Sequence, residues 1–195
     1  MAPLHVFAAL ALVCLGVASQ PDCNELVKPM VNLSSSVGKW ILHAATTDSE
    51  PMTAQMENYT SSWLHVKRIP DGNPQIAEIA NKVNGGCVYI QTNVSAVGDK
   101  LLMALNLENQ NLEFNGQFYE TCPDCLLWSD TVKWFGPTEI RRLLLFTKTG
   151  NMTLPNLERF KQQASCLNFT LGLHMTSDTD LCPEEKEEIA VKEDQ

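Results

Sequence analysis

The sequence has few basic residues and only one long apolar run. It carries 14 Lys and Arg against 23 Asp and Glu, which gives a formal net charge of −9. An acidic protein of this kind is a poor partner for nucleic acid and for anionic membranes. The apolar run, Val6 to Val17, lies near the start of the chain, and no later segment is long enough to cross a bilayer as a helix. We therefore expect no nucleic-acid partner.

Motifs that carry enzymatic or metal chemistry are also missing. No Ser-His-Asp set, glycine-rich phosphate loop or pair of carboxylates stands out. His43, His65 and His174 are isolated and lack the spacing typical of metal ligands. No internal repeat, low-complexity tract or linker divides the chain. We expect a single domain that has no cofactor, holds no metal and is not an enzyme.

The first apolar run has the features of a secretory signal peptide. Val17-Ala18-Ser19 supplies the small residues of a cleavage site, but no Lys or Arg precedes the run. We expect a signal peptide at 1–19, and the alternative is its retention as an anchor. The remaining length suffices for one domain with a sizeable core, expected at 20–183. The charged tail at 184–195 is expected to be disordered.

Secretion would place the cysteines beyond the signal peptide in an oxidising compartment, where disulfides are the default. Their pairing is open from the sequence pattern alone. The Cys122-x-x-Cys125 spacing also occurs in redox pairs, but those need a helix N-terminus, and this pair lies at a strand corner. Five N-x-S/T sequons predict a heavily glycosylated, plasma-type protein, and used sites must lie at the surface. The sequons begin at Asn32, Asn58, Asn93, Asn151 and Asn168.

Short strand-like segments separated by turn residues fill the body of the chain, which predicts a sandwich or an up-and-down barrel. A helix should follow from Thr153 to about Cys166, because apolar residues recur there at helical spacing. A short further strand is expected within Phe169 to His174. The loop around Asp48 and Met52 is a candidate lid. The expected strands are Lys39–Thr46, Tyr59–Arg68, Gln75–Lys82, Cys87–Val94, Leu101–Leu107, Leu112–Tyr119, Leu126–Val132 and Arg141–Lys148.

Several segments resemble lipocalins. Residues 38–45, which begin Gly38-Lys39-Trp40, resemble the first strand of that family. Residues 86–90 resemble the fourth-strand cysteine segment of alpha-1-acid glycoprotein (orosomucoid), and 140–146 resemble the last barrel strand of apolipoprotein M. Residues 157–167 resemble the helix and cysteine that follow in both. The chain is also similar in layout to fish plasma proteins that bind tributyltin and saxitoxin or tetrodotoxin.

The resemblance implies an all-β fold, an eight-stranded antiparallel up-and-down barrel with one C-terminal helix packed outside. It also implies disulfides between Cys23 and Cys166 and between Cys87 and Cys182. Cys122 and Cys125 depart from both relatives, and we pair them with each other. The family further implies a barrel base in which Gly38 and Trp40 lie at the closed end and Arg142 stacks across Trp40, with Arg141 as second choice.

Alternation within the expected strands predicts which side chains point inward. A sugar on Asn93 would turn Ile90 inward, and the same argument applied to Asn58 turns Tyr59, Trp63 and His65 inward. These residues either form plain core or line a cavity with a few orienting polar groups. We expect a cavity lined by Leu42, Ala44, Tyr59, Trp63, His65, Ile79, Ile90, Met103, Leu105, Phe114, Phe118, Leu144 and Phe146.

These features predict a secreted plasma carrier, a monomer, that holds a small hydrophobic or amphipathic ligand such as a lipid, a steroid-like molecule or a toxin. With Arg142 assigned to the base, the expected lining holds few cations, which argues against a strongly anionic ligand. One alternative is a lipoprotein-associated carrier with a retained signal anchor. Another is a lipocalin-type enzyme, although no mature cysteine remains as its nucleophile.

Overall fold

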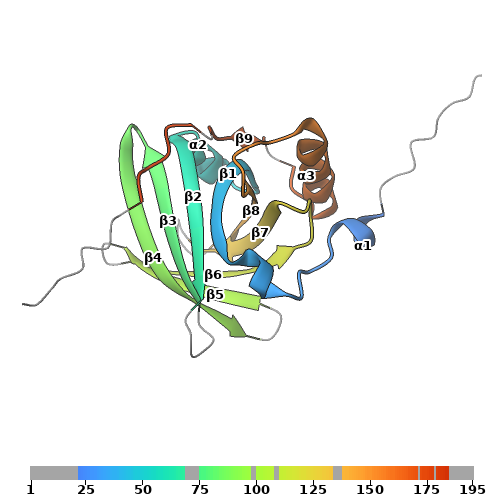
Figure 1. Ribbon diagram of the computed structural model, residues 1–195, viewed down its shortest axis with the longest axis horizontal. Coiled ribbons are helices and arrows are strands. Elements are labelled where there is room, and N and C mark those ends of the chain that lie inside the picture. The colour runs from blue at the N-terminus through green and yellow to red at the C-terminus, as the bar shows by residue number, and fades with distance from the viewer. Residues whose placement is uncertain are drawn as a thin grey trace, which may run out of the picture.

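The computed structural model describes residues 22–68, 75–97, 100–107, 110–133, 138–170, 172–177 and 179–184; the expected signal peptide and most of the charged tail lie outside these ranges. Eight antiparallel strands form a closed barrel, with helix α3 outside it (Figure 1). The strands are β1 (Gly38–Thr47), β2 (Tyr59–Arg68), β3 (Gln75–Val83), β4 (Gly86–Val97), β5 (Lys100–Leu107), β6 (Gln110–Tyr119), β7 (Cys125–Val132), β8 (Ile140–Thr147) and the short β9 (His174–Met175).

Each strand pairs with the next along the chain, and β1 closes the barrel by pairing with both β8 and β2. All eight barrel strands were expected, with ends that differ by a few residues. Helix α3 spans Leu154–Cys166 with Thr153 as its N-cap, as the helical spacing predicted. Three short elements were not anticipated: α1 (Cys23–Leu26), the 3₁₀ helix η1 (Leu33–Ser36) and α2 (Glu50–Met56).

Helix α2 follows β1 because the local sequence supplies a helix start. The Ser49 side chain accepts a hydrogen bond from the backbone N–H of Met52, and Pro51 lies in the first turn, where its missing N–H costs nothing. Met52 and Met56 are the buried side of this helix and pack on strand residues at one end of the barrel. The expected lid segment is therefore a helical cap at that end, seen beside the upper ends of β1 and β2 in Figure 1.

Two β-bulges change the inward phase of β1 and β2. The register of β1 against β8 shifts between Leu42 and Ala44, and that of β2 against β3 shifts between Tyr59 and Ser61. A bulge adds one residue to one strand, so every side chain beyond it changes face. Ala44 therefore packs outside the barrel against α3 rather than in the cavity, which corrects one expectation.

The closed end of the barrel is built around Trp40. Its side chain is 2% exposed, and its indole N–H donates to the carbonyl oxygen of Ser36, 2.7 Å away in η1. Gly38 has a φ of +120°, which only glycine adopts without strain. The cation above the Trp40 ring is the ammonium of Lys148, 4.9 Å from the ring centroid.

The expected Arg142–Trp40 stack is wrong. Arg142 lies near the start of β8, whereas Trp40 lies near the start of β1, and antiparallel pairing places these two positions at opposite ends of the barrel. The second choice, Arg141, points outward and forms an ion pair with Asp48. Lys148 directly follows β8 and reaches the closed end because the strand ends there.

The described residues contain three disulfides. Cys23–Cys166 and Cys87–Cys182 are the pairs that the resemblance implied, and Cys122–Cys125 is the pair expected for the two cysteines that depart from the relatives. The first ties the N-terminal arm to α3. The third lies at the corner before β7 and not at a helix N-terminus, which fits a structural role. Cross-links of this kind stabilise a fold mainly by restricting the unfolded chain.

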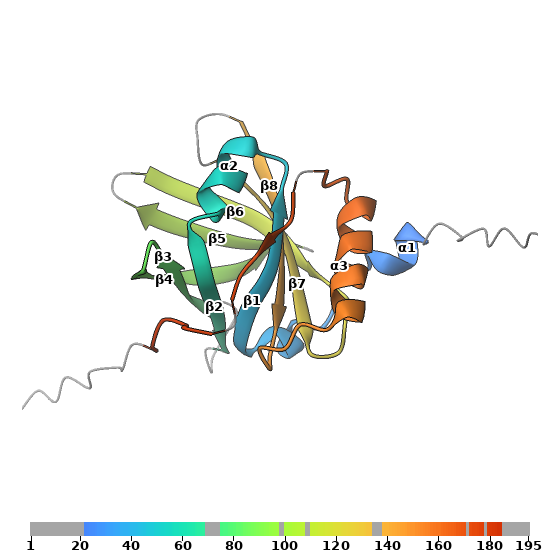
Figure 2. The same ribbon diagram turned by 90° about the horizontal axis from the view of Figure 1, so that it is seen from above.

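The second disulfide anchors a C-terminal strap, residues 174–177 and 179–184, against the outside of the barrel. The strap enters between β1 and β2, where the backbone N–H of Thr176 donates to His43 and that of Ser177 donates to Thr60. It then crosses to Cys87 on β4 (Figure 2). The strap closes the part of the β1–β2 seam that direct pairing between these strands leaves open.

Candidate ligand-binding cavity

The barrel encloses a cavity of about 150 Å³. A single water needs only about 10–15 Å³ on this measure, so the space suits a larger molecule. Most of its wall is apolar, and a few polar groups interrupt it, which is the composition typical of small-molecule sites. The wall is formed by Leu42, Met52, Met56, Tyr59, Ser62, Leu64, Val66, Gln75, Ala77, Ile79, Asn81, Ile90, Thr92, Val94, Leu101, Met103, Leu105, Phe114, Phe118, Trp128, Arg142, Leu144, Phe146 and His174.

Most of the residues expected around the ligand do line this cavity. The expected inward residues of β4, β5, β6 and β8 are in the correct phase. Strands β4, β5 and β6 pair with their neighbours without a register shift. The expected residues found in the wall are Leu42, Tyr59, Ile79, Ile90, Met103, Leu105, Phe114, Phe118, Leu144 and Phe146.

Trp63 and His65 do not line the cavity, and this corrects the expectation for β2. Trp63 is buried on the outer face beneath the strap, where its indole N–H donates to the carbonyl oxygen of Cys182 at 2.8 Å. His65 lies near Glu78 on the same outer face, with 3.8 Å between Nδ1 and Oε2. The bulge after Tyr59 explains the error, because Tyr59 stays inward while the following inward residues are Ser62, Leu64 and Val66.

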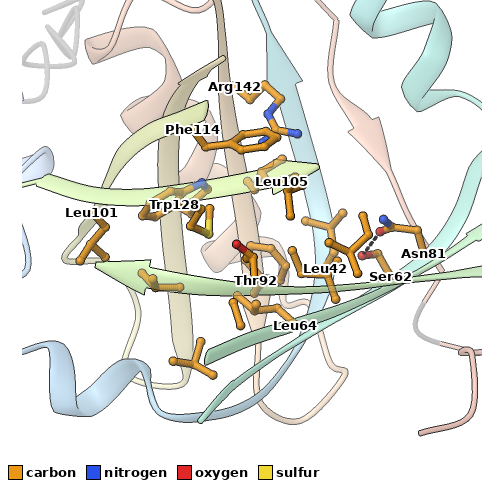
Figure 3. Close-up of a pocket in the computed structure, with 18 of the residues that line it drawn as sticks. Leu42, Ser62, Leu64, Asn81, Thr92, Leu101, Leu105, Phe114, Trp128 and Arg142 are labelled. Atoms are coloured by element: carbon orange, nitrogen blue, oxygen red, sulfur yellow. Dashed lines mark hydrogen bonds between the residues drawn. The ribbon is translucent and has the colours of Figure 1, made fainter. Parts of the chain in front are cut away.

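A polar cluster occupies one wall near the end that α2 covers. The guanidinium of Arg142 donates from Nε and Nη2 to the two carboxylate oxygens of Asp130, at 2.9 and 2.5 Å. Asp130 also accepts from the indole N–H of Trp128 at 2.7 Å. The guanidinium carbon lies 4.9 Å from the ring centroid of Phe114, and Figure 3 shows Arg142 above that ring. The cluster is thus a buried ion pair braced by two aromatic side chains.

Burial and charge act on the ionisable groups of this wall in opposite directions. Burial alone would lower the pKa of Arg142, but the adjacent Asp130 carboxylate outweighs it, so the pKa is raised and the side chain stays charged. Burial raises the pKa of the Tyr59 hydroxyl, against a smaller opposing effect of Arg142. At neutral pH the wall therefore presents a guanidinium and a neutral phenol.

Further polar groups lie on the wall formed by β2, β3 and β4 and on the strap. The Ser62 hydroxyl bonds to the Asn81 side-chain oxygen at 2.7 Å, a contact drawn in Figure 3. The Thr92 hydroxyl donates to the carbonyl oxygen of Ala104 at 2.8 Å. His174, from the strap, places Nε2 3.0 Å from the carbonyl oxygen of Tyr59. These side chains have hydrogen-bond partners within the protein, so they contribute shape and mild polarity to the wall.

Comparison with known proteins identifies the architecture. No protein-family model matches the sequence, and no curated protein matches it. Among solved structures, lipocalin 12 from rat epididymis aligns over 79% of this chain and 90% of its own, with 14% identity and a TM-score of 0.63. Odorant binding protein OBP1 aligns over 78% and 97%, with 11% identity and a TM-score of 0.61. Aphrodisin, a sex pheromone from female hamster, aligns over 75% and 98%, with 16% identity and a TM-score of 0.59.

The chain has the lipocalin fold. Within this lipocalin barrel, the described residues include no helix long and apolar enough to cross a membrane. The same part of the chain holds no group of three or more His, Cys, Asp or Glu side chains placed to bind a metal ion. The mostly apolar wall of the cavity has the composition typical of a site for a small molecule.

Sequence reasoning missed several residues of the lipocalin cavity. Trp128 belongs to the strand 126–132, for which no inward face was proposed, although Leu126, Trp128 and Asp130 alternate there. Met52 and Met56 lie on a helix that was expected to be a loop, and their spacing of four residues is the helical signal that could have revealed it. Asp130 gave no signal, because a lone carboxylate in a strand is usually solvated.

Four of the five sequon asparagines lie in loops or caps, and Asn93 lies on the outward face of β4. All five asparagine side chains are exposed. Asn93 alternates with the inward Thr92 and Val94, as expected for a residue whose sugar must point away from the lumen. Occupancy of these sites stays a prediction.

Proposed function

We propose that this protein is a secreted carrier that binds a small hydrophobic or amphipathic molecule inside the barrel and performs no chemistry on it. The observation that carries the proposal is the enclosed, mostly apolar cavity of about 150 Å³, which a closed barrel of this size provides. Its structural neighbours include a siderocalin of dual ligand specificity and an odorant-binding protein. They support small-molecule binding as the role of such a barrel.

The direct test uses the neutral dye N-phenyl-1-naphthylamine, which becomes fluorescent in apolar surroundings. Val94→Phe places a larger side chain in the cavity wall, and we expect it to weaken dye binding by about tenfold, or about 1.4 kcal/mol. Val97→Phe makes the same change at a 58% exposed position of the same strand and should leave binding unchanged. Equal affinity in wild type and Val94→Phe would place the dye outside the barrel.

Intrinsic fluorescence identifies where the ligand lies. Trp128 lines the cavity, whereas Trp63 is buried outside it under the strap. Trp128→Phe should therefore remove much of the quenching that a bound ligand causes, and Trp63→Phe should preserve it. The reverse result would place the bound molecule beneath the strap rather than in the barrel.

Secretion into plasma and carriage rather than catalysis are parts of the same proposal. N-terminal sequencing of protein recovered from culture medium should begin near Ser19 or Gln20; an intact Met1 region would favour the anchored, lipoprotein-associated alternative. All six cysteines beyond the expected signal peptide are paired in disulfides, which supports carriage over thiol catalysis. Titration of the native protein with a thiol reagent should accordingly find no reactive thiol.

The resemblance to alpha-1-acid glycoprotein, apolipoprotein M and the fish toxin-binding proteins supports a plasma carrier of lipid-like molecules or toxins as the specific role. Mass spectrometry of small molecules extracted from protein purified from its natural fluid would identify the cargo. Recovery of a lipid, a steroid-like molecule or a toxin at near-equal stoichiometry would support this role. Recovery of a water-soluble ion alone would oppose it.

A further inference from the structure

The polar cluster in the cavity wall is electrically balanced. Arg142 is the only Lys, Arg, Asp or Glu among the described residues that line the cavity. Its counter-ion, Asp130, does not reach the cavity surface, and its side chain has no exposed area, whereas that of Arg142 is 17% exposed. A ligand therefore meets a guanidinium whose charge is cancelled from behind.

The cluster offers the cavity unused hydrogen-bond donors, whereas the acceptor oxygens of Asp130 are already bonded. Asp130 accepts three hydrogen bonds, two from Arg142 and one from Trp128. Arg142 uses Nε and Nη2 in those bonds, and its Nη1 forms no hydrogen bond with the described residues. The hydroxyl of Tyr59, on the same cavity, is likewise without a hydrogen-bond partner among them. Both groups face the cavity, so a ligand oxygen that accepts from them forms hydrogen bonds and gains affinity.

We propose that the cavity selects uncharged amphipathic ligands whose polar end is a hydrogen-bond acceptor, and that Asp130 sets this selectivity by cancelling the charge of Arg142. This inference rests on the proposed carrier function and adds the ligand class. An ester, ketone or alcohol oxygen of the ligand would accept from the Arg142 and Tyr59 donors. The apolar part of the ligand would then contact the wall around Leu64 and Phe118.

Charge balance decides between neutral and anionic head groups. A carboxylate that enters this cavity loses its hydration, and only a site of net positive charge offsets that free-energy cost. An unpaired arginine would offset the lost hydration by forming a bidentate, charge-assisted pair with the carboxylate. Here Asp130 already occupies that bidentate position, so the next carboxylate would meet a site of no net charge. Dehydration of a neutral acceptor costs much less free energy, and that acceptor still forms hydrogen bonds with the Arg142 and Tyr59 donors.

The test compares dodecyl compounds that differ only in head group, as competitors of N-phenyl-1-naphthylamine at pH 8 and below their micelle concentrations. The compounds are methyl dodecanoate, dodecanol, dodecanoate and dodecylammonium. For the wild type we expect the ester and the alcohol to bind at least about tenfold more tightly than either ion. Dodecanoate binding as tightly as the ester would overturn the proposal.

Charge variants then test the role of Asp130. Asp130→Asn leaves Arg142 uncompensated, so the affinity ratio of dodecanoate to ester should rise by at least about tenfold. Arg142→Gln leaves Asp130 uncompensated and should raise the ratio of dodecylammonium to ester instead. Asp48→Asn is the matched control, because it breaks the ion pair of the neighbouring Arg141 on the outside of the barrel and should change neither ratio.

The outcomes separate this inference from the carrier function. If the dye does not bind wild-type protein, the carrier function fails. If the dye binds and all four head groups compete equally, the carrier function stands and the selectivity is wrong. Unchanged ratios in folded Asp130→Asn would overturn the role of Asp130. If that variant does not fold, the wild-type series and Arg142→Gln still decide the matter.

Discussion

The two ends of the barrel handle their polar groups differently. At the closed end, the indole N–H of Trp40 is bonded to Ser36, and the ring is covered by Lys148. At the end under α2, the donors of Arg142 and Tyr59 face the cavity without a bond to the described residues. Those donors are open to a molecule in the cavity, whereas the indole N–H of Trp40 is already bonded. The closed end therefore contributes stability, and in the proposed function the covered end contributes recognition.

The side chains that seal the two ends also differ in flexibility. Trp40 is rigid and fills the closed end within one apolar cluster. Met52 and Met56 of α2 seal the other end with flexible, polarisable side chains that tolerate rearrangement. The cover over this end therefore rests on flexible side chains, whereas the closed end rests on a hydrogen-bonded tryptophan.

The largest effect expected from this comparison is on folding. Trp40→Ala should lower the free energy of unfolding by about 3–5 kcal/mol, the usual loss for a buried tryptophan. Met56→Ala at the opposite end should cost less, because that side chain borders the cavity and leaves fewer close contacts to lose. Urea unfolding followed by circular dichroism measures both. A larger loss for Met56→Ala would reverse the assignment of the stabilising end.

A smaller effect is expected midway along the barrel, at Gly116. A Cβ there would lie 2.5 Å from both a ring atom of Trp128 and the carbonyl oxygen of Ser129. Gly116→Ala should therefore displace Trp128 and cost about 1–3 kcal/mol, as overpacking does. Gly86→Ala is the control, since its nearest contact would be an ordinary 3.6 Å.

The fluorescence of Gly116→Ala gives a second measurement of the same change. Trp128 both lines the cavity and bonds to Asp130, so its displacement should alter the quenching by bound ligand as well as the head-group preference. A variant that is destabilised but retains both properties would show that Trp128 does not hold the polar cluster in place.

Hydrophobic alternation and helical spacing predicted the strands, α3 and part of the cavity wall, because these patterns follow directly from burial of one face. They failed where geometry depends on non-local detail. The bulge between Tyr59 and Ser61 moved Trp63 outward, and nothing in the sequence of β2 marks that bulge. Which cation would cover Trp40 depended on how far β8 extends. Arg142 and Lys148 both fit a cation near the last strand, and only the pairing register places Lys148 at the closed end.

The smallest effect concerns Lys148, which replaces Arg142 as the cation over Trp40. Its ammonium lies 4.9 Å from the ring centroid, and the side chain is exposed, so the interaction should stabilise the fold by only about 0.5–1 kcal/mol. Lys148→Met keeps the apolar stem over the ring and removes the charge. We expect a loss of that size in the free energy of unfolding, greater at low than at high salt, because salt screens exposed charges.

The ligand affinity of Lys148→Met tests whether the closed end influences ligand binding. Lys148→Met should leave both the dye affinity and the head-group order unchanged, because Lys148 lies beyond the closed end and does not line the cavity. Lys161→Met, at an exposed lysine of α3, controls for the general loss of a surface charge and should have no effect on Trp40. A changed head-group order in Lys148→Met would mean that charge at the closed end is felt by the ligand. Recognition would then be shared between the two ends, since the closed end would do more than seal the barrel.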